Sequence, residues 1–225
     1  MLGRDEEALN AQVSAAMVNN VTVQGMPLDV TKADQIAATV EAAVDTQGPI
    51  DILVNNAGAA TSAPFGRTKL DQWQAMLDVN LTGPFLLTQA ILPGMVERGF
   101  GRVINVASTA GLKGYGYVAP YCAAKHGLIG LTRSLAVEFA RSGVTINAVC
   151  PGFTETDIVS RTIETMVEKT GRTEQQAYDQ LVALNPQGRL VQPSEVAQSV
   201  GWLALETSSS INGQAIAVAG GEIMS

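Results

Sequence analysis

The segment IDILVNNA, residues 50–57, decides the fold class. Ile52, Leu53 and Val54 form a short continuous apolar run that ends in two asparagines. Such a run is typical of a strand that is covered on both faces in a parallel sheet. Four further segments have the same character and are predicted as strands: residues 21–26, 101–108, 144–150 and 214–221.

Longer segments with helical spacing of apolar residues separate these strands. Ile36, Val40 and Val44 illustrate the spacing. The predicted helices cover residues 33–45, 70–99 and 121–141, and an irregular helical excursion is expected over 157–187. Alternating strands and helices predict one α/β domain over residues 1–225 with a parallel sheet between helical layers.

Composition narrows the class of protein. The chain has 225 residues, 46% of them hydrophobic and 16% charged, with a formal net charge of −7. This charge argues against a nucleic-acid partner. No apolar run approaches the roughly 18 residues of a membrane span, and the first residues lack the apolar core of a signal peptide. Cys122 and Cys150 suit a reduced compartment, although one disulfide between them is compatible with the sequence. We expect a cytoplasmic protein.

Ligands of parallel α/β sheets bind outside the carboxyl ends of the strands. The loops expected at that edge hold Asp29 and Val30, the NNAG segment at 55–58, Ser108, and Pro151 with Gly152. Residues distant in sequence should therefore converge on one site.

Tyr121 and Lys125 carry the most suggestive chemistry, within YCAAKHGLIG at 121–130. Positions i and i+4 share a helix face. An ammonium ~4 Å from a phenol contributes up to ~4 kcal/mol at an effective dielectric of ~20, equivalent to about three pKa units. The pair therefore predicts a tyrosine whose lowered pKa suits proton transfer, with Ser108 able to hydrogen-bond the same substrate oxygen. A chance surface pair is the alternative.

Other catalytic classes lack their residues. The chain has one histidine, His126, and two cysteines far apart in sequence, so no metal site is expected. A G-x-S-x-G nucleophile elbow is absent. His126 adjoins Lys125 and projects in a different direction, so we interpret it as a packing or surface residue.

The combined pattern resembles the short-chain dehydrogenase/reductase family, most closely its β-ketoacyl-thioester reductase branch. The similarity runs in order along nearly the whole chain. It rests on Asp29, NNAG at 55–58, Asn80 in DVNLTGPF, Ser108 in INVAS, YCAAK at 121–125, PGFTETD from Pro151, NPQGRLVQPSEVA at 185–197 and INGQAIAVAGG at 211–221. The resemblance implies a Rossmann-like doubly wound sheet. It also implies an NAD(P)-dependent oxidoreductase acting on a ketone or secondary alcohol, with 3-oxoacyl thioesters as a candidate class.

The resemblance also implies residue roles. Tyr121 would exchange a proton with the substrate oxygen, Lys125 would lower the pKa of Tyr121 and bind the nicotinamide ribose, and Ser108 would orient the carbonyl. Asn80 would kink its helix and hold a water that relays protons to Lys125; an ordinary polar helix residue is the alternative. The remaining cofactor contacts would come from Asp29, Val30, Asn56, Ala57, Gly58, Pro151, Gly152, Thr154 and Thr156. Thr156 is equally suited to cap a helix before Asp157.

The same resemblance explains Gly127 and Gly130 as close-approach positions, where the helix packs against its copy in another subunit of a homotetramer, or of a dimer. The segment 158–184 would form a lid over a small carbonyl or alcohol substrate. Its cations Arg161, Lys169 and Arg172 suit a phosphate-bearing carrier, or are simply solvated.

The resemblance predicts a first strand and glycine-rich phosphate loop ahead of MLGRDEEALN, and the sequence contains neither. Met1 and Leu2 are expected to end the second strand, with a helix over residues 5–19. The near match to G-x-G-x-x-A that starts at Gly114 does not directly follow a strand, so we interpret it as a loop with aromatic residues near the substrate. We expect an N-terminally incomplete domain; a chain that truly began at Met1 would bind cofactor weakly, or would be a non-catalytic family member.

Cofactor choice rests on Arg4. Enzymes that use NAD place an acidic residue where the second strand ends, whereas an arginine there accommodates the 2′-phosphate of NADP. Gly3 and Arg4 occupy this position, so NADP is predicted over NAD. The neighbouring Asp5 favours NAD, and an ordinary surface arginine is the remaining alternative.

Overall fold

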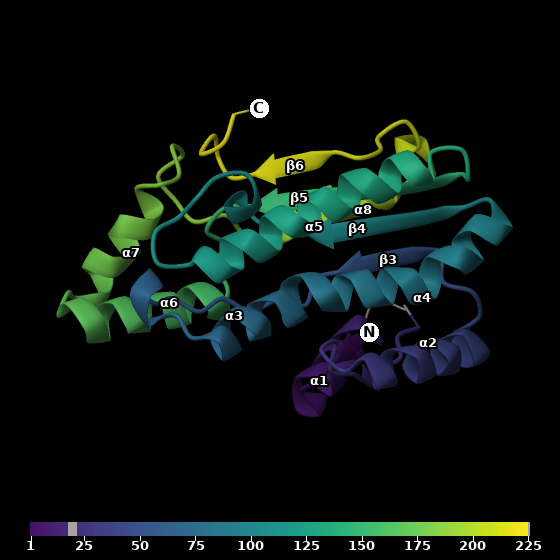
Figure 1. Cartoon of the computed structure of the whole chain (residues 1–225), viewed down its shortest axis with the longest axis horizontal. Helices are drawn as coiled ribbons and strands as arrows, with labels where there is room; N and C mark the ends of the chain where they lie inside the picture. The colour runs from purple at the N-terminus through teal and green to yellow at the C-terminus, as the bar shows by residue number, and fades with distance from the viewer. Residues whose placement is uncertain (18–21, 225) are drawn as a thin grey trace.

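The computed structural model describes residues 1–17 and 22–224. Four parallel strands form the main sheet in the order β3 (Ile52–Asn55), β4 (Gly101–Val106), β5 (Val144–Pro151) and β6 (Ala215–Val218). A separate parallel pair joins β1 (Leu2–Gly3) to β2 (Met26–Pro27). Figure 1 shows helices α4 (Gly83–Arg98) and α5 (Ala119–Glu138) in front of the sheet and α8 (Pro193–Ala204) behind it. The predicted α/β architecture with a parallel sheet is confirmed.

The central strands are buried as their continuous apolar sequences predict. Val103 and Ile104 of β4 and Ile146, Ala148 and Val149 of β5 are at most 1% exposed. Helix α5 packs on β5 from one side, and α8 contacts β4 and β5 from the other. Covering both faces explains why these strands lack the alternation of apolar and polar residues seen in half-exposed strands.

One prediction for the sheet is wrong. The strand expected at 21–26 is observed at Met26–Pro27, because its partner β1 pairs only over Leu2–Gly3. Val21, at the start of the predicted strand, and Val18 and Asn19, at the end of the predicted helix over 5–19, lie outside the described residues. The end-of-strand assignment for Leu2 is confirmed, and α1 (Glu6–Met17) follows it.

The predicted helix over 70–99 is interrupted. Helix α3 (Leu70–Leu77) passes into a π-helical turn over Asp78–Thr82, and α4 then continues from Gly83. π-helical turns interrupt regular helices and are frequent at functional sites. The expected kink at Asn80 is confirmed, because Asn80 lies in the middle of this turn.

The two sheets share one hydrophobic core. Leu28 and Val30 after β2, with Ile36 and Val40 of α2 (Ala33–Gln47), belong to the same buried cluster as Leu53 of β3 and Leu87, Ile91 and Leu92 of α4. This shared core places the loop after β2 beside the loops of the main sheet.

The structure shows what surrounds Gly127 and Gly130 and the state of the two cysteines. Gly127 packs within its own chain: a Cβ at this position would lie 2.8 Å from a methyl carbon of Leu81. Within the chain, its close neighbour is the π-helical turn. Gly130 has open space around it and is exposed. Cys122 and Cys150 are both free and buried, so the disulfide is not formed.

The excursion over 157–187 is two helices with a core of their own. Helices α6 (Asp157–Thr170) and α7 (Glu174–Val182) bury Val159, Ile163, Ala177 and Leu181 together with Leu190. Helix α8 was not among the predicted helices. Its Pro193 in the first turn and the capping pair of Gln192 with Glu195 are the sequence signals that identify it.

Among the described residues, one helical stretch, Leu70–Arg98, is long and apolar enough to cross a bilayer by composition alone. It contains α3, the π-helical turn and α4. Met76, Leu87, Ile91 and Met95 within it are buried, and it packs against α5 and the sheet. The apolar composition is therefore that of a core helix.

Candidate active site

Parallel pairing brings the predicted loops to one edge of the sheet. Asn55 of β3 is paired with Asn105 of β4, and Val106 with Val149 of β5. The residues that follow, 56–58, Ser108 and 151–152, therefore leave the sheet at the same end. Helix α5 crosses this end with Tyr121 and Lys125 in its first two turns.

Lys125 is the most constrained of these side chains. It is 4% exposed, its Nζ donates a 2.8 Å hydrogen bond to the Val106 carbonyl, and Nζ lies 5.7 Å from the centre of the Tyr121 ring. Burial lowers the pKa of Lys125 to about 8 because a low-dielectric interior disfavours the charged form.

The expectation that Lys125 lowers the pKa of Tyr121 is wrong for this arrangement. The pKa of Tyr121 is raised, because burial of the phenol dominates and the hydrogen bond with Ser108 opposes it only in part. Lys125 lies over the ring and donates to the β4 carbonyl. The phenol is therefore neutral at pH 7, the form that donates a proton.

Ser108 follows β4 directly and lies where the prediction placed it. Its backbone is extended, its Oγ accepts the Ala110 N–H at 3.1 Å, and its side chain lies near enough to Tyr121 to lower the pKa of the phenol. Ser108, Tyr121 and Lys125 thus converge at the carboxyl end of β4, as the sequence predicted.

Asn80 lies beside the same ammonium and is fully buried. Its Nδ2 donates to the carbonyls of Ala59 at 2.9 Å and Met76 at 3.0 Å, and its Oδ1 faces the Ala59 N–H at 3.4 Å. A Cβ on Gly58 would lie 3.1 Å from Asn80 Oδ1 and 3.8 Å from Lys125 Nζ. Gly58 therefore separates the two polar groups, and a side chain there would fill the space between them.

Asp29 and Arg4 lie close enough to influence each other electrostatically. Asp29 accepts the Thr31 N–H at 3.0 Å and the Thr31 hydroxyl at 2.8 Å. These hydrogen bonds chiefly lower its pKa, with smaller contributions from the charges of Arg4 and Lys32. Arg4 is exposed, and Val30 is buried in the shared core.

The segment after β5 is held by backbone hydrogen bonds to Val218 and Val191 and by its own hydroxyls. Thr154 Oγ1 donates to the Gly152 carbonyl at 3.0 Å, and Thr156 Oγ1 donates to the Thr154 carbonyl at 3.2 Å. Thr156 occupies the N-cap position of α6, but its side chain accepts no capping hydrogen bond. Asn56, Ala57 and Gly58 are exposed at the same edge, next to Pro151 and Gly152, which are partly buried.

The site has the chemistry to hold a nicotinamide cofactor. Lys125 makes one hydrogen bond among the described residues, so its ammonium has two further N–H donors beside Gly58. A buried ammonium with free donors suits the hydroxyls of a ribose. The exposed Arg4 guanidinium suits a phosphate.

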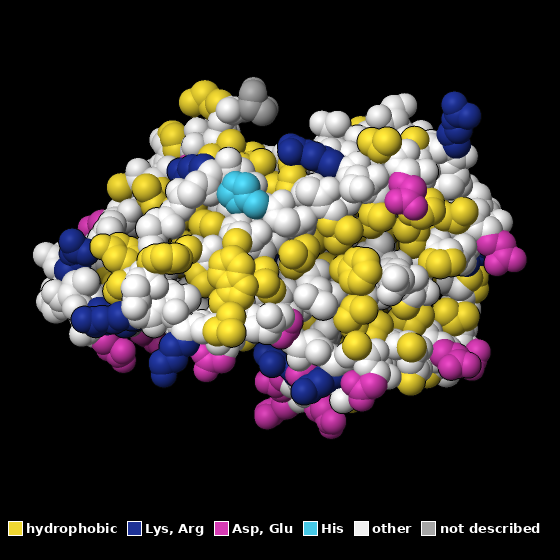
Figure 2. Space-filling view, viewed as in Figure 1, with side chains coloured by type: hydrophobic (Ala, Val, Ile, Leu, Met, Phe, Trp, Pro, Cys, Tyr) yellow, Lys and Arg dark blue, Asp and Glu magenta, His cyan; other side chains and the backbone are white. Residues whose placement is uncertain are grey.

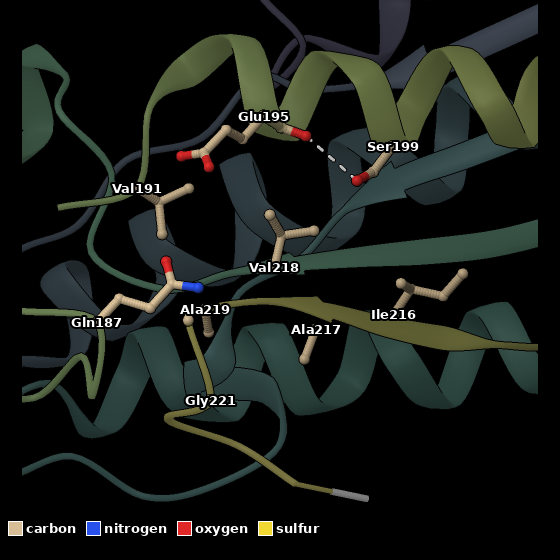
Figure 3. A pocket seen from close by; sticks show the side chains of 10 residues that line it. Gln187, Val191, Glu195, Ser199, Ile216, Ala217, Val218, Ala219 and Gly221 are labelled. Atoms are coloured by element: carbon tan, nitrogen blue, oxygen red, sulfur yellow. Dashed lines mark hydrogen bonds between the residues drawn. The ribbon is translucent and has the colours of Figure 1, made fainter. Parts of the chain in front are cut away.

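The other candidates for a functional site are His126, metal-binding groups and a surface hollow. His126 is exposed on α5, with Nδ1 2.9 Å from the Cys122 carbonyl, as expected for a surface residue. In the part of the chain that the structure describes, no group of three or more His, Cys, Asp or Glu could hold a metal ion. A hollow of about 420 Å³ lies between α8 and β6 (Figure 3), lined by residues such as Glu195, Ser199 and Val218, and none of the predicted site residues lines it.

Two polar residues near the site were not predicted as a pair. Tyr115, in the loop before α5, donates a 2.5 Å hydrogen bond to Glu222 near the end of the chain. These residues are 107 positions apart. No local spacing in the sequence could connect them.

Comparisons with known proteins agree with this geometry. The family model described as enoyl-(acyl carrier protein) reductase matches residues 2–222. A putative ketoacyl reductase of Streptomyces coelicolor is 40% identical over 220 residues, which cover 97% of this chain and 84% of that protein. The 3-oxoacyl-(acyl-carrier-protein) reductase of Vibrio cholerae is 41% identical over 201 residues, covering 89% and 78%.

A solved structure of a variant of actinorhodin polyketide ketoreductase with NADPH has a TM-score of 0.94 at 38% identity, covering 98% of this chain and 85% of that one. The chain belongs to the short-chain dehydrogenase/reductase family, in its 3-oxoacyl reductase branch. It is an oxidoreductase with a nicotinamide cofactor, and the alternative of a non-catalytic family member is not favoured.

The buried ammonium predicts an unusual dependence of stability on pH. Below pH 8 Lys125 is protonated in both folded and unfolded states, so its desolvation cost is fully present. As pH rises from about 8 to the unfolded value of 10.5, only the unfolded state keeps the proton, and stability increases. Lys125→Met should therefore raise the free energy of unfolding at pH 7 by up to ~3 kcal/mol, and this advantage should shrink by pH 10. Urea denaturation at both pH values measures it; a variant that is less stable at pH 7 contradicts the prediction.

Proposed function

We propose that this chain reduces a ketone to a secondary alcohol, or oxidises the alcohol, with NADP(H), and that 3-oxoacyl thioesters are its substrate class. One observation carries the proposal: Ser108, Tyr121 and Lys125 meet at the carboxyl end of β4 beside Asn80 and Gly58. The names of the Streptomyces and Vibrio relatives, both ketoacyl-type reductases, support the substrate class.

In the proposed reaction Tyr121 is the general acid. When bound, the nicotinamide supplies the hydride that reaches the carbonyl carbon. The carbonyl π-electron pair takes the proton from Tyr121 Oη, so that the C–O double bond becomes an alcohol. Ser108 donates a hydrogen bond to the same oxygen and fixes its position between the two hydroxyls. Tyr121 is protonated near neutral pH and so has a proton to give, although burial raises its pKa and makes it a weaker acid than a free phenol.

Lys125 and Asn80 support that proton transfer. The Val106 carbonyl holds the Lys125 ammonium 5.7 Å from the centre of the Tyr121 ring, and the ammonium would have to approach the phenol oxygen to stabilise the phenolate left on Tyr121. The proton is replaced through a water held near Asn80, the role that the resemblance implies. The two N–H donors of Lys125 that point away from β4 would bind the nicotinamide ribose.

The remaining cofactor contacts follow the loops at the edge of the sheet. Asp29 and Val30 would flank the adenine, and Asn56, Ala57 and Gly58 would line the ribose. The segment after β5 would hold the carboxamide, through Pro151, Gly152, Thr154 and Thr156. Arg4 would pair with the 2′-phosphate, which makes NADP the proposed cofactor and NAD the alternative. A solved gluconate 5-dehydrogenase from Burkholderia cenocepacia in complex with NADP and tartrate, with a TM-score of 0.88 at 31% identity and covering 99% of this chain and 84% of that one, supports a phosphorylated cofactor.

The helices α6 and α7, within residues 157–187, are proposed as the substrate lid of the single domain. Lys169 of α6 donates a 3.3 Å hydrogen bond to the Ser62 carbonyl, which ties the lid to the loop after β3. We also propose a cytoplasmic location, as the composition suggests.

A homotetramer is the proposed assembly, with a dimer as the alternative. A groove of about 510 Å³ runs between α4 and α5 and is lined mainly by apolar side chains, including Phe85, Leu92 and Phe139. Figure 2 shows hydrophobic side chains gathered over these two helices. Phe85 of α4, which lines the groove, is 41% exposed. Apolar patches of this kind mark interaction sites on soluble proteins.

Removing the proposed acid tests the mechanism. Tyr121→Phe should lower kcat for ketone reduction by ~10²- to 10⁴-fold, the usual contribution of general acid catalysis. NADPH binding, followed by cofactor fluorescence, should be largely retained. Thr46→Val, which removes an exposed hydroxyl on α2, is the control and should keep full activity. Near-normal turnover by Tyr121→Phe would refute the assignment.

The cofactor preference rests on one charge. Arg4→Glu should weaken NADPH binding by ~10- to 100-fold, the worth of one charge-assisted hydrogen bond, while NADH binding stays near its starting value. Arg141→Glu, at the opposite end of the sheet, is the control. Titration with both cofactors measures the effect. Equal losses of affinity for NADPH and NADH would show that Arg4 does not bind the 2′-phosphate.

The proposed assembly is tested at the α4–α5 groove. Phe85→Asp places a charge in the apolar groove and should shift the protein to a smaller species, as measured by light scattering after size exclusion. Val44→Asp on α2 should leave the mass unchanged. A wild-type protein that is monomeric at micromolar concentration would contradict the proposal.

A further inference from the structure

The chain turns back toward the active site after β6. Gly220 and Gly221 both have positive φ, 59° and 93°, the region that glycine adopts most easily. Figure 3 shows this turn at Gly221, beyond the end of β6. It brings Glu222 inward, where its side chain is only 3% exposed.

The Glu222 carboxylate meets the loop that leads into α5. Its Oε1 accepts the Tyr115 hydroxyl at 2.5 Å and lies 2.9 Å from Lys113 Nζ. Because the Tyr115 proton goes to Glu222, the Thr109 hydroxyl donates to Tyr115 Oη, at 2.7 Å. Burial and the hydrogen bond to Glu222 raise the pKa of Tyr115, so this phenol stays a donor throughout the physiological range.

The same carboxylate lies against the other wall of the site. A Cβ on Gly152 would lie 3.1 Å from Glu222 Oε2. Next to it, Phe153 packs edge-on against Tyr115, with ring centres 5.9 Å apart, and also contacts the core of α6 and α7. Glu222 therefore joins the tail, the loop before α5 and the base of the proposed lid.

The loop that Glu222 contacts contains one residue, Tyr117, in a strained backbone conformation. Tyr117 has a φ of 68°, unusual for a residue with a side chain, and is 70% exposed. Its carbonyl accepts the Ala63 N–H at 2.8 Å. Non-glycine residues keep such a conformation only where surrounding contacts over-determine it. The loop runs from Thr109, next to Ser108, to Val118, three residues before Tyr121.

We propose that Glu222 is a positioning residue for substrate binding: through Tyr115 and Lys113 it fixes the loop 109–117 against Phe153 and so shapes the substrate side of the active site. The inference rests on the proposed reduction of ketones. Among the described residues, Glu222 pairs with Tyr115 and Lys113 and makes no hydrogen bond or ion pair with Tyr121 or Lys125, so we place its effect on the shape of the site and not on the proton transfer.

Substitutions at both ends of the contact test the proposal. Glu222→Ala removes the acceptor and the charge, Glu222→Gln keeps an acceptor oxygen, and Tyr115→Phe removes only the hydroxyl. Glu41→Gln, on exposed α2, is the control. KM and kcat are measured with a long-chain 3-oxoacyl thioester and with a small cyclic ketone. In parallel, limited trypsin digestion reports cleavage after Lys113, which measures loop order without any activity.

The expected results separate positioning from general damage. Glu222→Ala and Tyr115→Phe should each raise KM for the long thioester about tenfold, with kcat and the small ketone changed less than about threefold. The double variant Glu222→Ala with Tyr115→Phe should match Glu222→Ala alone, since Glu222→Ala already removes the contact that Tyr115→Phe removes. Glu222→Gln should restore most of the affinity, and trypsin should cut Glu222→Ala faster after Lys113.

Three outcomes overturn the inference: unchanged KM in Glu222→Ala, unchanged cleavage after Lys113, or equal losses of kcat with both substrates. These three outcomes overturn the inference only if the wild-type enzyme itself reduces the substrates. A wild-type protein that reduces neither substrate would instead refute the proposed function on which the inference rests.

Discussion

The active site depends on one buried cation. Lys125 can remain an ammonium inside the protein only because the Val106 carbonyl accepts one of its protons and because polar groups of Asn80 and the loop at Gly58 lie beside it. Burying an ammonium is costly and shifts its pKa downward. The packing of α5 on β5 therefore lowers the stability of the fold but places a hydrogen-bond donor where a cofactor can bind it. Such a loss of stability is common at functional sites.

The same packing explains the behaviour of Tyr121. A helix that brings Lys125 under the sheet edge also buries the phenol, and burial outweighs the hydrogen bond from Ser108. The result is a tyrosine that is protonated near neutral pH but is a weaker acid than a free phenol. Lowering its pKa for the reverse reaction would need the ammonium closer to the phenol oxygen than in the present arrangement.

Three different structural elements position the side chains at the edge of the sheet. The π-helical turn over Asp78–Thr82 places Asn80, the end of β4 places Ser108, and the C-terminal turn at Gly220 and Gly221 places Glu222. Each support lies outside the helix that carries Tyr121. The relative positions of these three side chains therefore depend on several packed elements. Loosening any one of these elements would displace a side chain at the site.

The sequence by itself determined the parallel α/β architecture, because continuous apolar strands alternating with helical spacing have few other solutions. It also determined the meeting of Ser108, Tyr121 and Lys125, since parallel strands end at one edge. Only the tertiary structure decided the direction of the Tyr121 pKa shift, the contact of Gly127 with Leu81 and the contact of Tyr115 with Glu222. These depend on burial and on distances between segments remote in the chain, and no local pattern of residues encodes either quantity.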